Sequence, residues 1–475
     1  MRDTPDPSSS SLFSPGEVRL IVLGLTLALF LSSLDQTIVA TALSTIAGDL
    51  GGWALLPWVV SAYLIASTVT TPIYGRLSDL YGRRPVLLVS ISLFVLGAML
   101  SALAQSMPML ILMRVVQGLG GGGLRAISLA VVGDILPPRE RGKVQGYLSG
   151  TFATANICGP VLGGLFVEYL SWHWIFWINL PLGAAAFAAT YFQLRRLPLP
   201  GKRPRIDWPG AALIVLACTP VLIGITLIQR SGDWLSPAAW GCFALGIAGT
   251  AALILQERAA PQPMLPLHLF RNGIFTTAIV ITGLASMVMM ALTVLVPLAY
   301  QMVAGLSAKQ AGLRMIAMTL GSVSGSFLAG LAVTRTGRYR ALPILGTSTA
   351  LAMCLVVALV GLGHSLLLDT AVTLALGLGF GCQFSPITVT IQNAVDPRDG
   401  GVAVACMMFF RLMGGAFGVA LLSALLLGRL GPGGTASPEQ AAAAFSVVFL
   451  AAGGIAALCL IAALRLQEIP LRGRS

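Results

Sequence analysis

Long apolar stretches dominate this chain of 475 residues, and they limit its possible folds more than any motif does. Hydrophobic residues make up 56% of the chain and charged residues only 10%. In soluble globular proteins about a quarter of the residues are charged. Because so few charges cannot cover a surface that faces water, we expect an integral membrane protein whose outer surface contacts the lipid bilayer.

Each of the apolar segments is long enough to cross the hydrocarbon core, which takes about 20 helical residues. Since backbone groups find no water in lipid, each segment must satisfy its own hydrogen bonds as an α-helix. The sequence therefore predicts an all-α membrane protein with fourteen spanning helices. The segments are residues 18–45, 53–75, 85–104, 108–133, 144–167, 172–194, 208–229, 236–256, 272–302, 310–334, 341–363, 366–393, 400–428 and 441–464.

The Lys and Arg residues indicate how these helices are oriented. With the N-terminus in the cytoplasm, 22 of the 29 fall in cytoplasmic segments or at their edges, and only Arg230, Lys309 and Arg429 fall in external loops. Cytoplasmic loops of membrane proteins carry such an excess. We therefore expect a multi-pass protein of the cytoplasmic membrane with both termini in the cytoplasm. Because topology explains the net charge of +12, no nucleic-acid partner is expected.

The chain divides into two similar halves. A basic cluster, formed by Arg195, Arg196, Lys202, Arg203 and Arg205, follows the sixth segment. We expect a tail at 1–16, a six-helix bundle at 17–197, a linker with two inserted helices at 198–260, a second six-helix bundle at 261–466 and a tail at 467–475. Related loops, Gly75–Arg84 and Gly330–Arg340, follow the second helix of each bundle. Such weak internal repeats are typical of secondary transporters.

Two ionisable residues are predicted at a similar depth inside the membrane. Asp35 lies about 17 residues into the first helix, or about 25 Å along its axis. Arg114 lies about one to two turns from the outer end of the fourth helix, which runs in the opposite direction. Charged groups inside the bilayer are costly and normally functional. Burial opposes ionisation of the carboxyl group while a guanidinium favours it, so the pair can bind and release a proton. The alternatives are an inert structural pair and an Arg114 that extends outward to water.

The loop after the second helix combines glycines with charges. Gly75 and Gly82 allow a tight turn close to neighbouring helices. Asp79 can accept hydrogen bonds from Arg83 and lie near a helix N-terminus. A purely positive membrane anchor would explain Arg83 and Arg84, but not the acidic residue or the glycine spacing.

The fifth helix contains a proline within a set of glycines. Pro160 removes a backbone hydrogen bond and bends a helix. Gly159 and Gly163 allow another helix to approach closely, and Gly164 completes the motif. On physical grounds alone, this pattern indicates only a bent, tightly packed helix.

Taken together, these motifs resemble the major facilitator superfamily, in its fourteen-helix drug:proton antiporter branch. The resemblance covers residues 17–466 and includes Leu34–Leu43, Gly75–Arg84, Arg114–Gly121, Asn156–Gly164 and Trp172–Gly183. It implies two six-helix bundles plus two inserted helices. It also implies that Gly75–Arg84 latches the halves on the cytoplasmic side with Asp134 as a partner, and that the Gly159–Pro160 motif marks an exporter.

The resemblance implies antiport by alternating access, in which proton entry drives export of small lipophilic or cationic drugs and other toxic compounds. The alternative is export of an endogenous metabolite or lipid by the same mechanism. The partners implied are the lipid bilayer, a small lipophilic substrate and protons. We expect a monomer, and the need for a periplasmic adaptor stays open.

The second half contains one ionisable residue near mid-membrane, Arg411, with no acidic residue at that depth, since Asp369 and Asp396 lie near loop ends. We expect Arg411 to bond backbone carbonyls beside neighbouring glycines, and the missing carboxylate argues against dicationic substrates. Aromatic and amide side chains suit an apolar binding cavity. The residues expected to line it are Tyr63, Gln117, Tyr300, Gln301, Gln383 and Phe384.

The sequence contains no constellation typical of a catalyst. It has no nucleotide-binding P-loop and no cluster with metal-ligand spacing, and its seven cysteines form no close pairs. We therefore expect neither an enzyme nor direct use of ATP, and no cofactor apart from the transported proton.

Overall fold

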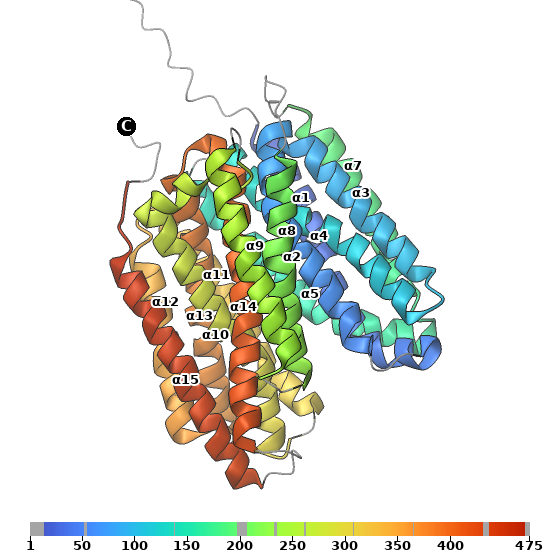
Figure 1. Cartoon of the computed structure of the whole chain (residues 1–475). Coiled ribbons are helices and arrows are strands. Elements are labelled where there is room, and N and C mark those ends of the chain that lie inside the picture. The colour runs from blue at the N-terminus through green and yellow to red at the C-terminus, as the bar shows by residue number, and fades with distance from the viewer. Residues whose placement is uncertain are drawn as a thin grey trace, which may run out of the picture.

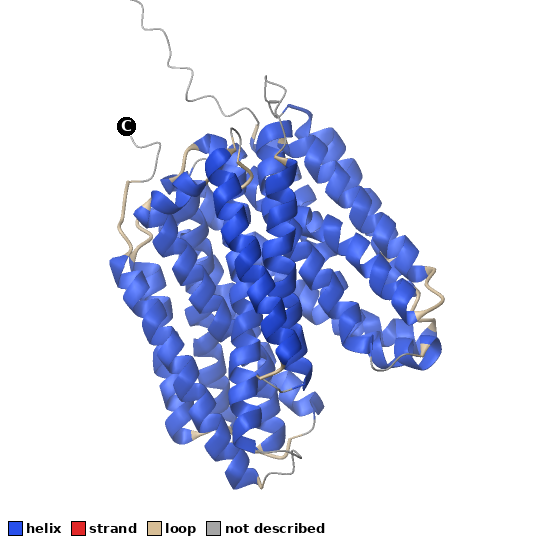
Figure 2. Cartoon of the chain, viewed as in Figure 1, coloured by secondary structure: helices blue, strands red, loops and turns tan. Residues whose placement is uncertain are grey.

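The computed structural model describes residues 14–51, 55–136, 138–196, 207–231, 235–260, 263–306, 308–363, 365–430 and 437–470. These residues form helices joined by short loops, with no strand among them (Figure 2). This confirms the predicted all-α fold class. Parts of the predicted tails, at 1–13 and 471–475, lie outside the described residues, as do Lys202, Arg203 and Arg205 of the basic cluster.

Within the described residues, thirteen of the fifteen α-helices each match one predicted apolar segment, and α6 and α7 together match the sixth. Their bounds are α1 Pro15–Leu50, α2 Leu56–Tyr81, α3 Arg83–Ala102, α4 Met107–Ile135, α5 Pro138–Tyr169, α6 Trp174–Trp177, α7 Asn179–Gln193, α8 Trp208–Ser231, α9 Pro237–Ala259, α10 Gly273–Met302, α11 Ala308–Thr336, α12 Ala341–Val360, α13 Leu366–Ala394, α14 Gly400–Leu430 and α15 Pro438–Arg465. Short 3-10 turns occupy Leu194–Arg196, Leu267–Arg271 and Pro397–Asp399.

Twelve spans within the described residues are long and apolar enough to cross a membrane, with α6 and α7 counted together. The helices α2 and α5 are outside this set, although they contain 26 and 32 residues. Both contact helices of the other half, α2 with α14 and α5 with α11. Because such helices need less apolar surface, length and composition alone identify fewer spans, and the number fourteen stays a prediction.

The helices form two bundles with a helix pair beside them (Figure 1). In the first bundle α4 packs against α2 and α3, while α1 packs against α5 and α7. In the second bundle α11 packs against α13, α10 against α14 and α12 against α15. The helices α8 and α9 pack on each other, and α8 also contacts α2 and α14, so this pair borders both bundles.

The two bundles meet mainly through α2 with α14 and through α5 with α11. They lie close together at the end of the molecule near the C-terminus and diverge toward the opposite end (Figure 1). Glycines allow the close approach. A Cβ at Gly75 would collide with Ala405 on α14, and one at Gly146 would lie 2.9 Å from the Phe327 Cα on α11.

The two related loops adopt similar turns but hold different partners. Gly82 and Gly337 both have a positive φ, at 93° and 69°, which only glycine adopts without strain. In the second loop, the Tyr339 amide donates to the Glu468 carboxylate at 2.9 Å, and the Ile469 amide donates to the Tyr339 hydroxyl at 2.9 Å. The second-half loop therefore binds the segment after α15.

Candidate functional site

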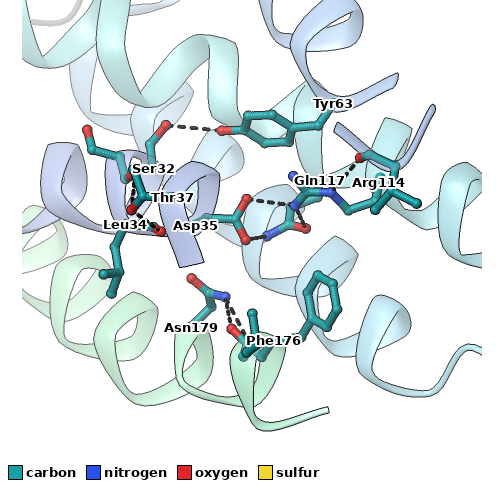
Figure 3. Close-up of polar contacts among 12 residues, drawn as sticks. Ser32, Leu34, Asp35, Thr37, Tyr63, Arg114, Gln117, Phe176 and Asn179 are labelled. Carbon is teal, nitrogen blue, oxygen red and sulfur yellow. Dashed lines mark hydrogen bonds and ion pairs between the residues drawn. The ribbon is translucent and has the colours of Figure 1, made fainter. Parts of the chain in front are cut away.

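Asp35 and Arg114 form a buried ion pair between α1 and α4 (Figure 3). An Arg114 Nη1 donates to one carboxylate oxygen of Asp35 at 2.6 Å. The side chains are 0% and 1% exposed, respectively. Burying a carboxylate or a guanidinium without a partner of opposite charge costs a large desolvation free energy. In this pair each group stabilises the charge of the other.

Further bonds fix the orientation of both side chains. The Gln117 amide donates to the second Asp35 oxygen at 2.9 Å and accepts from Arg114 at 2.7 Å. The Arg114 Nε donates to the Val59 carbonyl at 3.1 Å, and its guanidinium lies 4.4 Å from the centre of the Tyr63 ring. Each oxygen of the carboxylate thus accepts a hydrogen bond from a different side chain, and together these bonds hold the carboxylate in one orientation.

Small residues on α4 create the space for this cluster. The Tyr63 hydroxyl would lie 2.5 Å from a Cβ at Gly121, and the Tyr63 carbonyl 2.6 Å from a Cβ at Gly118. The same hydroxyl hydrogen-bonds the Ser32 hydroxyl at 3.1 Å, one turn before Asp35 (Figure 3). The close packing of α2 on α4 therefore brings Tyr63 over the ion pair.

A second buried arginine extends the network, and its role is absent from the sequence-based expectations. The Arg125 Nε donates to the Ser32 hydroxyl at 3.1 Å, and the Gln36 amide lies against the Arg125 guanidinium. Arg125 follows Arg114 by three helical turns on α4 and shows no spacing signal of its own. Its partner is identified only by the packing of α1 on α4.

Gly159 and Gly163 of α5 face the helix that carries Asp35. A Cβ at Gly159 would collide with the Thr37 hydroxyl, and one at Gly163 with the Thr41 hydroxyl. Thr37 also donates to the Ala155 carbonyl across the two helices at 3.0 Å. Gly164 faces away with open space around it. The backbone of Pro160 continues α5, while its side chain lies outside what the structure describes.

The Gly75–Arg84 loop joins the two bundles through Asp79. The Asp79 carboxylate accepts hydrogen bonds from the amides of Gly401 at 2.9 Å and Val402 at 2.8 Å. These amides begin α14, where the helix dipole favours a negative charge. Arg83 pairs with Asp79 and donates to Asp134 at 2.7 Å.

Arg84 points to a different partner from Arg83. Its guanidinium lies 4.6 Å from the centre of the Tyr191 ring on α7. Arg84 thus packs within the first bundle, while Asp79 and Arg83 lie at the contact between the bundles.

Two adjoining cavities lie at the centre of the molecule, and Arg411 borders both. The larger, open cavity has a volume of about 860 Å³ and lies between α4 and α5 of the first bundle and α10, α11, α13 and α14 of the second. The smaller has about 370 Å³ and lies within the second bundle. The Arg411 guanidinium stacks 3.8 Å from the centre of the Phe384 ring. The expected bonds from Arg411 to backbone carbonyls are not found among the described residues.

The residues expected to line one cavity fall in separate places. Gln383 and Phe384 line the central cavities, whereas Tyr63 and Gln117 belong to the Asp35 cluster. Tyr300 is fully buried beside Arg314, 5.0 Å from ring centre to guanidinium. Gln301 is exposed and bonds back to a carbonyl of its own helix.

The second bundle contains an ion pair that the sequence did not reveal. Asp369 on α13 is 1% exposed and pairs with Arg314 on α11. It also accepts a hydrogen bond from the Gly363 amide at 3.1 Å. Asp369 lies in the first turn of its helix, which agrees with its predicted place near a loop end, but packing of α11 buries it there.

A sequence profile described as the Major Facilitator Superfamily matches residues 25–419 of this chain. The chain belongs to the major facilitator superfamily. The chain is 33% identical in sequence to Multidrug resistance protein 3 of Bacillus subtilis, and the alignment covers 85% of this chain and 78% of the relative. It is also 33% identical to the Multidrug transporter protein MdtP of that species, over 87% and 76%. Efflux pump FUS6 of Gibberella moniliformis is 31% identical, over 88% and 76%.

Solved structures support the same fold at low sequence identity. The human organic anion transporter MFSD10 superposes with a TM-score of 0.65 at 16% identity, covering 93% of this chain and all of that one. The proton:xylose symporter XylE superposes with a TM-score of 0.64 at 14% identity, covering 93% and 95%. The protein is therefore a membrane transporter of the major facilitator fold.

Proposed function

We propose that this transporter exports small lipophilic compounds across the cytoplasmic membrane in exchange for protons, with Asp35 as the proton-binding group. It would belong to the fourteen-helix drug:proton antiporter branch, with both termini in the cytoplasm. The buried Asp35–Arg114 pair carries this proposal. An acidic residue buried in a membrane protein at such cost is normally part of an ion or proton pathway.

The contacts around Asp35 offer a route from protonation to a change of conformation. Neutral Asp35 would attract Arg114 less strongly and rearrange the bonds to Gln117. Helix α1 carries Asp35 and packs on α5 through Thr37, and α5 forms an interface with α11 of the other bundle. Movement of α1 would therefore act on a contact between the halves, as alternating access requires.

The proton gradient supplies enough free energy for useful export. A proton crossing 100 mV gains about 2.3 kcal/mol, and one pH unit adds about 1.4 kcal/mol. Together they support a substrate gradient of several hundredfold, roughly, for each proton. No other energy source is needed for this scheme.

The names of the relatives support export in general and leave two substrate classes. Multidrug resistance and multidrug transporter proteins favour a broad set of lipophilic compounds. The alternative is an endogenous metabolite or lipid, and the acurin A biosynthesis cluster transporter of Aspergillus aculeatus, 31% identical, favours this reading. Both classes use the same coupling residue.

Proteoliposomes test the coupling proposal directly. Vesicles that contain the purified protein are loaded with a panel of anionic, neutral and cationic lipophilic dyes, and dye export is measured with and without an imposed pH gradient. The Asp35→Asn variant should lose gradient-driven export while it still exchanges dye between equal pH values. Gradient-driven export by Asp35→Asn at the wild-type rate would contradict the proposal. Asp369→Asn serves as the matched control, because that carboxylate is equally buried in the other bundle.

A further inference from the structure

The unusual feature of the central cavity is the charge of Arg411. This residue is the twelfth of α14, about 17 Å along the helix from its first residue. It borders both cavities and is partly exposed to them. A guanidinium stays charged in proteins, so the cavity wall carries a permanent positive charge deep in the bundle.

Three buried arginines of these bundles have carboxylate partners, whereas Arg411, like Arg125, has none among the described residues. Arg114 pairs with Asp35, Arg83 with Asp79 and Arg314 with Asp369. By contrast, the described residues that line the two cavities include no aspartate or glutamate. Arg125 adds further positive charge to the surroundings of Arg411.

The Phe384 ring only partly replaces a counter-ion. It stacks on one face of the guanidinium at 3.8 Å. A cation–π contact stabilises the charge but leaves the N–H groups, which point outward in the plane of the guanidinium, without acceptors. Those donors are geometrically suited to bind both oxygens of a carboxylate.

Three threonine hydroxyl groups of the larger cavity already donate to backbone carbonyls. Thr293, Thr319 and Thr388 each line the larger cavity, and each donates to a carbonyl one turn earlier in its own helix. Gln145 and Ser322 add neutral polar groups to the lining, and among the described lining residues Arg411 alone offers a charged donor to a bound anion.

The remaining lining is apolar and adaptable. Met289, Met315 and Met318 line the larger cavity together with Phe152 and Phe384. Flexible thioethers and aromatic rings accept lipophilic groups of varied shape. The cavity thus combines one fixed positive charge with a wall that suits an apolar body.

We propose that the substrates of this transporter are lipophilic organic monoanions, such as aryl or alkyl carboxylates, whose acidic group binds Arg411. This rests on the proposed export function and replaces the expected cationic drugs as the preferred class. It has an electrical consequence. A proton that enters and an anion that leaves move charge in the same direction, so an inside-negative membrane potential drives both.

Binding to the whole protein in phosphatidylcholine nanodiscs tests the charge preference without transport. The probes are 1-naphthoate, the neutral 1-naphthamide and the cation 1-naphthylmethylammonium, which share one ring system. The wild-type protein should bind 1-naphthoate at least tenfold more tightly than either of the others. Equal binding of the three probes, or preference for the cation, would overturn the proposal.

Two variants then locate the charge. Arg411→Gln should reduce the affinity for 1-naphthoate at least tenfold and leave that for 1-naphthamide within about twofold, whereas Arg411→Lys should retain part of the preference. Arg429→Gln, which removes an exposed arginine in the last turn of the same helix, is the control and should not alter the preference. If Arg411→Gln fails to fold, the proposal is still tested by the preference of the wild-type protein for 1-naphthoate and by the part of that preference that Arg411→Lys retains. Unchanged 1-naphthoate binding in Arg411→Gln would refute the role of Arg411.

Transport separates this inference from the proposed coupling. Selective binding of 1-naphthoate without export under a pH gradient would support the anion site and contradict proton coupling. Gradient-driven export of 1-naphthylmethylammonium without 1-naphthoate binding would support proton coupling and contradict the anion site. In the case we expect, an inside-negative potential accelerates 1-naphthoate export.

Discussion

The Arg114 guanidinium on α4 donates a hydrogen bond of 2.6 Å to the Asp35 carboxylate on α1, a helix that runs antiparallel to α4. Both side chains are almost completely buried. The same guanidinium also bonds Gln117 and the Val59 carbonyl, so three fixed acceptors define its position. Lysine carries the same charge, but its single ammonium nitrogen cannot reach all three acceptors as the planar guanidinium does.

Arg114→Lys should therefore keep part of the proton-linked export, and Arg114→Gln should abolish it. We expect the rate of gradient-driven export in proteoliposomes to fall about tenfold or more in the lysine variant, as for the loss of one charge-assisted hydrogen bond. A lysine variant as active as the wild type would mean that the geometry around Asp35 does not matter for coupling.

Asp79→Ala should loosen the contact between the two bundles. The variant loses two charge-assisted hydrogen bonds to the start of α14, each worth roughly 1.5–3 kcal/mol. Cys406 is buried on α14 near this contact and provides the readout. With the other six cysteines replaced, the rate at which maleimide labels Cys406 should rise tenfold or more. Asp396→Ala, which removes an exposed acid, is the control and should leave the labelling rate unchanged.

Two neighbouring glycines of α5 make a matched pair. Gly163→Ala places a methyl group against Thr41 and the Ile38 carbonyl, whereas Gly164→Ala points into open space. Overpacking of this kind costs roughly 1–3 kcal/mol. Thermal unfolding in detergent should therefore show a lower midpoint for Gly163→Ala alone. A similar midpoint for both variants would mean that α5 does not press on α1 as the structure shows.

Asp369→Asn should destabilise the second bundle without affecting the use of protons. It leaves Arg314 without its carboxylate, and breaking a buried pair costs roughly 3–5 kcal/mol, less here because Arg314 is 19% exposed. The unfolding midpoint should fall while the ratio of export with and without a pH gradient stays at the wild-type value. A fall of that ratio toward one would mean that Asp369 in the second bundle takes part in proton coupling.

Sequence patterns predicted the helices and the neighbourhood of Asp35, because both follow from regular geometry. Apolar length places each helix, and antiparallel direction places Arg114 at the depth of Asp35. The contact of Asp79 with α14 joins positions more than 300 residues apart, so the spacing of the loop could suggest a nearby helix end but not which one.

Packing decides the features that were missed. Asp369 looks like a loop residue in sequence, yet α11 brings Arg314 over it. Arg411 was expected to bond backbone carbonyls, but its helix turns it toward Phe384 and the cavity. Gln301 and Tyr300 are adjacent in sequence and point in different directions, one exposed and one buried. No local pattern distinguishes these outcomes.

The central claim is that Asp35 itself binds and releases the coupling proton, and infrared difference spectroscopy tests it without a substrate. Spectra of the reconstituted protein are recorded while the pH is lowered, for the wild type, Asp35→Asn and Asp369→Asn. We predict a band of a protonated carboxyl group that appears in the wild type and in Asp369→Asn and is missing in Asp35→Asn. The same band in all three proteins would show that the titrating group lies elsewhere.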